Sequence, residues 1–140
     1  MPNLHPVLVH FPIALLTASV AFDLFGIVLR RQELERSGWW TLVIGCAGLV
    51  LTVVSGLLAK ESVTIPQQAQ GHFDVHQQLA FAVAGVYALL LLWRIASRTR
   101  LPHRREWLFI TLSLAGSLLL WFGAWHGGEM VYRFGVGVRP

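Results

Sequence analysis

Charged residues are scarce in this chain. Of its 140 residues only 13% are charged, whereas 55% are hydrophobic, and the mean hydropathy is +0.60. These values lie well outside the range of ordinary soluble domains. The composition therefore predicts an integral membrane protein.

Cysteine is nearly absent as well, since Cys46 is the only one. A single cysteine excludes an internal disulfide and also the C-x-x-C-H motif of covalently attached haem. The sequence offers no nucleophile, base and acid in a hydrolase-like arrangement. The glycines of segment 127–140 lack the G-x-G-x-x-G spacing of a nucleotide site. Function must therefore depend on other side chains.

Four apolar blocks divide the chain, and each approaches the roughly 20 residues that a membrane-crossing helix needs. We predict one all-α domain, residues 1–140, with four transmembrane helices over 6–29, 39–59, 76–96 and 107–125 and an outer-face tail over 126–140. The first block contains Asp23 and two early prolines and lacks a basic start, so we interpret it as a retained helix rather than a signal peptide. Either Pro6 begins this helix or Pro12 does; a helix that starts at Pro6 is bent at Pro12.

The basic residues are unevenly divided between the two ends of these helices. Eight arginines flank one side, Arg30, Arg31, Arg36, Arg94, Arg98, Arg100, Arg104 and Arg105, against Lys60, Arg133 and Arg139 on the other. Positive charge favours the cytoplasmic side, so both termini are expected outside. Because the basic residues flank spans, they do not indicate nucleic-acid binding.

This topology brings five of the six histidines to the outer face, namely His5, His10, His72, His76 and His126. The segment "DVHQ" (74–77) resembles a capping box with Asp74 as N-cap, which places His76 in the first turn of the third helix. If Pro6 begins the first helix, His10 lies about one turn below the surface. The two imidazoles are then at similar heights on neighbouring helices.

Two imidazoles that face each other across a helix bundle can hold a haem iron from both sides. We predict that His10 and His76 are the axial ligands of a b-type haem, with Lys60, Arg133 and Arg139 as counter-charges for the propionates. The expected function is electron transfer between a quinol pool and a periplasmic or membrane redox protein at the outer face. We expect the protein to lie in the lipid bilayer. The sequence leaves open whether it forms a homo-oligomer.

Two alternatives remain open. Histidines such as His5, His72 and His126 could hold a transition metal ion, because imidazole suits zinc, copper and iron. The protein could instead be a cofactor-free structural or assembly subunit of a membrane complex, packed through its stripes of small residues.

Asp23 lies in the inner part of the first helix, where an unpaired charge is costly. Arg94, near the inner end of the third helix, is the expected partner. We predict a structural ion pair between these residues.

Two terminal motifs, "LHPVLVHFPIALL" (4–16) and "GGEMVYRFGVGV" (127–138), resemble a family of bacterial membrane proteins, domain of unknown function 2231. An acid at the position of Asp23 and a histidine at that of His76 also fit the family pattern. The resemblance implies a four-helix domain of the bacterial inner membrane, found in some relatives beside Rieske or cytochrome c domains. It supplies no established reaction.

Overall fold

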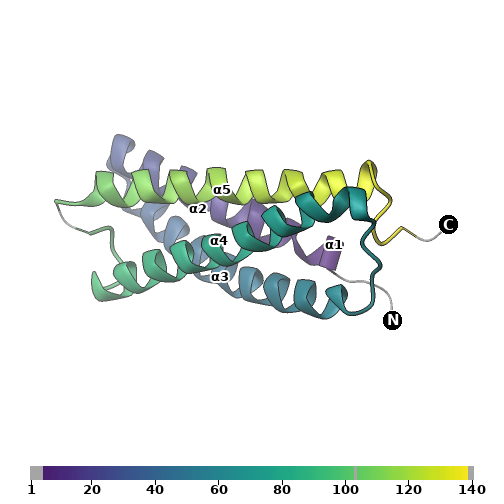
Figure 1. Ribbon diagram of the computed structural model, residues 1–140. Helices are drawn as coiled ribbons and strands as arrows, with labels where there is room; N and C mark the ends of the chain where they lie inside the picture. The colour runs from purple at the N-terminus through teal and green to yellow at the C-terminus, as the bar shows by residue number, and fades with distance from the viewer. Residues whose placement is uncertain (1–4, 103, 139–140) are drawn as a thin grey trace.

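The computed structural model of the protein describes residues 5–102 and 104–138, in which helices are the only regular secondary structure. Its elements are α1 (His5–Leu8), α2 (His10–Leu29), α3 (Gln32–Lys60), the short 3-10 turn η1 (Gln67–Ala69), α4 (Gln70–Ala96) and α5 (Glu106–Tyr132). Four stretches are long and apolar enough to cross a membrane: His5–Leu29, Gln32–Lys60, Gln67–Ala96 and Glu106–Tyr132. The prediction of an all-α bundle of four membrane-crossing helices is confirmed (Figure 1).

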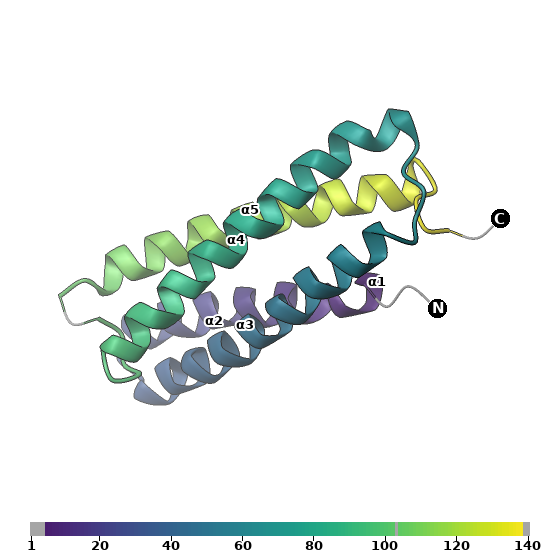
Figure 2. The same cartoon turned by 60° about the horizontal axis from the view of Figure 1, so that its bottom comes forward.

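The long helices form two hairpins. α2 packs mainly on α3 and α4 mainly on α5, while contacts of α2 with α5 and of α3 with α4 join the hairpins (Figure 2). The described chain begins and ends at the same end of the bundle, close to the connection between α3 and α4 (Figure 1). We name this the histidine end, because His5, His72, His76 and His126 belong to it. The opposite end, where the α2–α3 and α4–α5 turns lie, is the arginine end.

The hydrogen bonding of the first helix is interrupted at Val9, between α1 and α2, although Val9 keeps helical dihedral angles. Pro12 has no N–H, so the carbonyl of Leu8 loses the hydrogen bond that a continuous helix would give it. The Thr52 hydroxyl on α3 donates to that carbonyl instead, at 3.2 Å. The first helix therefore begins before Pro12 but is interrupted because of it, and α1 is held against α3.

The remaining helices extend beyond the predicted boundaries. α3 begins at Gln32 rather than 39, since Glu33 and Glu35 favour the positive end of the helix dipole in its first turn. α4 begins at Gln70, so Asp74 is inside the helix and accepts a hydrogen bond from the Gln70 side chain at 3.1 Å rather than capping. α5 continues to Tyr132, which shortens the predicted 126–140 tail.

The two hairpins repeat one arrangement, in which a residue of the first corresponds to the residue 71 positions later in the second. Gly45 allows Leu16 to approach α3, because a Cβ at that glycine would lie 2.6 Å from Leu16 Cδ2. Gly116 does the same for Tyr87, whose Cε2 would lie 3.3 Å away. The reciprocal contacts of α2 with α5 and of α3 with α4 are those expected of two copies around an approximate two-fold axis.

A buried ion pair joins the hairpins toward the arginine end. Arg94 Nη1 on α4 donates to Asp23 Oδ2 on α2, and the two side chains are 0% and 1% exposed. The guanidinium also donates to the carbonyls of Glu35, at 2.6 Å, and Thr99, at 3.3 Å. The structure thus brings together the two residues expected to pair. Asp23 and Arg94 are themselves 71 positions apart and correspond to each other in the repeat.

Candidate functional site

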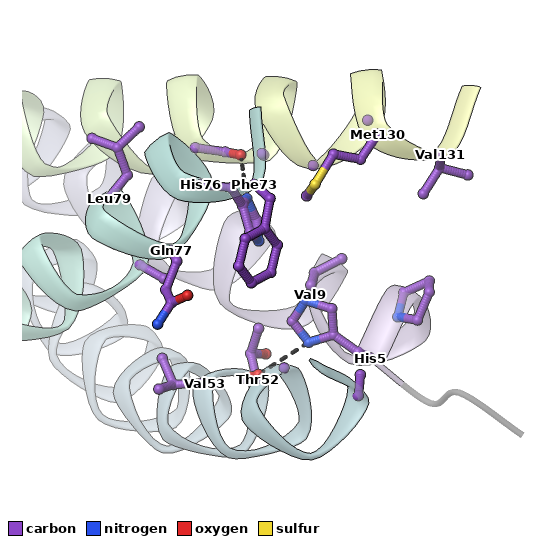
Figure 3. Close-up of a pocket in the computed structure, with 18 of the residues that line it drawn as sticks. His5, Val9, Thr52, Val53, Phe73, His76, Gln77, Leu79, Met130 and Val131 are labelled. Atoms are coloured by element: carbon purple, nitrogen blue, oxygen red, sulfur yellow. Dashed lines mark hydrogen bonds between the residues drawn. The ribbon is translucent and has the colours of Figure 1, made fainter. Parts of the chain in front are cut away.

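His5 and His76 face each other at the histidine end, one from each hairpin (Figure 3). Their ring centroids lie 6.2 Å apart and the ring planes are nearly perpendicular, at 84°. His5 belongs to α1 and His76 to the second turn of α4. The site is therefore assembled only where the two hairpins meet.

Each of these imidazoles is oriented by a backbone carbonyl. His5 Nδ1 lies 3.1 Å from the carbonyl of Thr52 and 3.0 Å from Ser55 Oγ on α3. His76 Nδ1 lies 2.7 Å from the carbonyl of Gly123 on α5. Because a carbonyl can only accept, each ring carries its hydrogen on Nδ1, and its lone pair is on Nε2. This is the tautomer that a metal-binding histidine adopts.

Two glycines make room for the rings. A Cβ at Gly56 would lie 3.0 Å from His5 Cε1, and a Cβ at Gly127 would lie 3.1 Å from His76 Cε1. In both hairpins the carbonyl is 47 residues after the histidine, and the glycine follows the carbonyl by one helical turn. The two half-sites are thus equivalent members of the repeat.

His10, the expected partner of His76, lies elsewhere. It is the first residue of α2 and its side chain is exposed at the edge of the same cavity. His5 and His10 are five residues apart along the first helix, so their side chains project from different sides of it, and the ring that reaches His76 is that of His5. The structure brings His76 together with His5 rather than His10.

A cavity of about 470 Å³ surrounds the His5–His76 pair, between the two hairpins. Its wall is largely aliphatic and aromatic, and it includes Met130 and Phe73 (Figure 3). No aspartate or glutamate occurs among the described residues that line it, and Lys60 is the one lysine or arginine among them. The size and apolar wall are those of a binding site for a small molecule or cofactor.

Of the three predicted counter-charges for the propionates, the structure places one at the cavity. Lys60 donates to Gln77 Oε1 at 3.2 Å and lies 5.1 Å from the centre of the Phe73 ring, at the cavity wall. Arg133 is exposed, 3.6 Å from Glu129, and does not line the cavity. Arg139 lies outside the described residues.

His72 and His126 form a second pair, from α4 and α5. Their Nδ1 atoms are 2.9 Å apart, with ring centroids at 5.0 Å. Within residues 5–102 and 104–138, no three His, Cys, Asp or Glu side chains lie close enough together to hold a metal ion. His5, His72 and His126 therefore do not form one site.

Sequence reasoning missed both pairings, although a signal was present. His5 and His76 are 71 positions apart, as are Gly45 and Gly116, and Gly56 and Gly127. A search for an internal repeat at this spacing would have aligned the two hairpins and matched His5 with His76.

Comparison with known proteins gives one match. No curated protein and no solved structure matches the chain. The family described as "Predicted membrane protein (DUF2231)" matches residues 1–140. The four membrane-crossing helices agree with that description. The chain therefore belongs to the family of predicted membrane proteins known as domain of unknown function 2231.

Proposed function

We propose that the protein is a b-type haem-binding membrane protein that transfers electrons, with His5 and His76 as the axial ligands. The observation that carries this proposal is the pair of imidazoles facing each other across an apolar cavity, with centroids 6.2 Å apart. Two imidazoles that share one metal ion, each with a nitrogen about 2 Å from it, hold their centroids roughly 6 Å apart. The observed spacing supports shared ligation of one iron.

The surroundings of the two rings support the same proposal. The carbonyls of Thr52 and Gly123 hold each ring in the tautomer that presents Nε2 to a metal. The wall is apolar, and Lys60 offers one positive charge to the carboxylates of the cofactor. Haem bound in this way supplies one-electron redox chemistry. The chain's own part is ligation and orientation.

The position of the cavity bears on the electron partners. Both imidazoles lie at the histidine end, so a haem there serves one side of the membrane. By the distribution of arginines, we propose that this side faces outward from the bacterial inner membrane. Electrons then pass between a membrane quinol and a periplasmic or membrane redox protein at the outer face.

An optical spectrum tests the proposal. The protein is purified in mild detergent from cells supplied with a haem precursor, and its spectrum is recorded oxidised and then reduced with dithionite. We expect a sharp α band on reduction. The band should disappear in His5→Ala and in His76→Ala, because each variant removes an axial ligand. It should persist in His10→Ala, the matched control from the edge of the same cavity.

Two other results have distinct meanings. A band that is lost in His10→Ala and kept in His5→Ala would assign the ligation to His10 and His76, as expected from the sequence. A featureless spectrum from folded, haem-replete protein would overturn the haem proposal. Metal analysis of that sample would then separate a metal site from a cofactor-free subunit.

The glycines behind the imidazoles give an independent test. In Gly127→Ala the new Cβ meets His76 Cε1 at 3.1 Å and displaces the ring, so haem affinity should fall about tenfold or more, the size of effect seen when the support of a metal ligand is disturbed. Haem titration of the purified apoprotein measures this. Gly85→Ala is the control, since Gly85 does not line the cavity and a Cβ there would meet nothing within 4 Å. Equal affinities in the two variants would contradict ligation by His76.

A further inference from the structure

The His72–His126 contact constrains the hydrogens of both rings. Between two Nδ1 atoms 2.9 Å apart there is room for one hydrogen, so one ring donates and the other accepts. In the neutral pair the donor ring has its lone pair on Nε2, and the acceptor ring has its hydrogen there. The pair can therefore gain one proton at the donor's Nε2 without losing the bond between the rings.

We propose that His72 and His126 form a proton-binding site at the histidine end, which takes up one proton from the adjacent aqueous phase and holds it as a single shared charge. His72 receives the proton at Nε2 and becomes an imidazolium, and its Nδ1–H bond to His126 becomes charge-assisted and stronger. A second proton would have to occupy His126 Nδ1 and would break that bond. The site thus binds one proton, not two.

Burial assigns these roles to the two rings. His72 is half-buried near the start of α4, whereas His126 is only 9% exposed. Among the described residues, nothing accepts or donates a hydrogen bond at His126 Nε2. A proton reaches the less buried ring more easily, so His72 is the entry and His126 the acceptor that holds the bond.

The groups around the pair can stabilise one positive charge. The ring centroids of Trp125 and Phe134 lie 5.9 and 5.5 Å from that of His72, and those of Phe122 and Trp125 lie 4.7 and 4.8 Å from that of His126. Three of these four contacts are edge-to-face, an arrangement that favours a cationic imidazole where its edge points at the face of the aromatic ring. The titratable groups that act on His126 are His72 and His76 from α4 and Glu129 from α5, and Glu129 is itself 3.6 Å from Arg133.

The repeat shows that this site belongs to one hairpin only. The residue of the first hairpin that corresponds to His126 is Ser55, whose hydroxyl lies 3.0 Å from His5 Nδ1. The first hairpin thus has a neutral hydroxyl, Ser55, beside His5. At the corresponding position the second hairpin has a titratable ring, His126. The proton-binding pair introduces a chemical difference between two otherwise equivalent halves. This holds whatever the cavity binds.

The experiment is an NMR titration of protein with ¹⁵N-labelled histidine, in detergent, from mildly acidic to mildly alkaline pH. We expect a nitrogen–nitrogen coupling across the His72–His126 bond, and ring shifts of both residues that move together at one midpoint with uptake of one proton. In His126→Ser the coupling should vanish, and the ring shifts of His72 should no longer follow the midpoint of the wild-type pair. That variant copies the side chain that the first hairpin already has at the corresponding position, Ser55.

The controls make each outcome decisive. His10→Ser removes a histidine whose side chain is exposed at the start of α2, so coupling and joint titration should be unchanged. Separate midpoints with one full proton each would overturn the proposal, as would unchanged titration of His72 in His126→Ser. If that variant does not fold, His72→Asn applies the same test from the other ring. The ring shifts of His126 should then no longer follow the midpoint of the wild-type pair.

Discussion

Replacing Arg94 by methionine is expected to destabilise the bundle by about 3–5 kcal/mol, because it leaves the Asp23 carboxylate as an unpaired charge in an apolar interior. Asp23 is 1% exposed, and the other carboxylate oxygen, Oδ1, has no hydrogen-bond partner among the described residues. The substitution also leaves the carbonyls of Glu35 and Thr99 without their donor. Denaturation of the purified protein in detergent, followed by circular dichroism, measures the loss.

A double variant separates the charge effect from packing. Asp23→Leu together with Arg94→Met removes both charges and fills the space with apolar side chains, a replacement that is often neutral or stabilising for a buried pair. Most of the stability should therefore return. A double variant as unstable as Arg94→Met alone would mean that the hydrogen bonds of Arg94 to the backbone, and not its pairing with Asp23, hold the hairpins together.

The second large effect is expected at Gly38, where α3 lies directly against the Asp23 carboxylate. In Gly38→Ala the new Cβ would overlap with Asp23 Oδ1 and would lie 2.7 Å from its Cγ. The carboxylate cannot retreat without leaving Arg94, and Ser19 Oγ donates to the Gly38 carbonyl at 2.8 Å, which fixes the helix spacing. We expect a loss of about 3 kcal/mol or more, combining overpacking with a disturbed ion pair.

Gly48→Ala is the matched control for this prediction. It lies on the same helix, and its Cβ would meet Pro12 Cδ at 3.5 Å, an ordinary van der Waals contact. Alanine is the better helix former by about 1 kcal/mol, so stability should stay the same or rise slightly. The same denaturation measurement applies. A loss in Gly48→Ala as large as that in Gly38→Ala would show that α3 tolerates no side chain at its glycines, whatever they face.

The four spans could be predicted from composition because long apolar blocks have one solution in a bilayer. Asp23 and Arg94 could be matched for a related reason: few charges lie within the blocks, and a buried charge needs an opposite one nearby. The helix boundaries were harder to predict, since the polar first turns of α3 and α4 are helical by local propensity and contain no hydropathy signal.

The histidine pairing could not be obtained from depth alone. Depth along the membrane made His10 and His76 equivalent, but the lateral direction of a ring depends on the face of the helix from which it projects, and His5 and His10 project from different faces. Similarly, His72 and His126 meet through a contact between residues 54 positions apart. Single-sequence patterns describe neighbours along a helix, and both pairs join different helices.

The equal spacing of histidine and carbonyl has a consequence for biogenesis. Each imidazole is oriented by a residue synthesised 47 positions later, on the helix that closes its own hairpin. Each half can therefore mature as soon as its hairpin has entered the bilayer, and the first is complete before α5 has been translated. The two rings meet only when the finished hairpins associate, so the cavity is created by the last step of assembly.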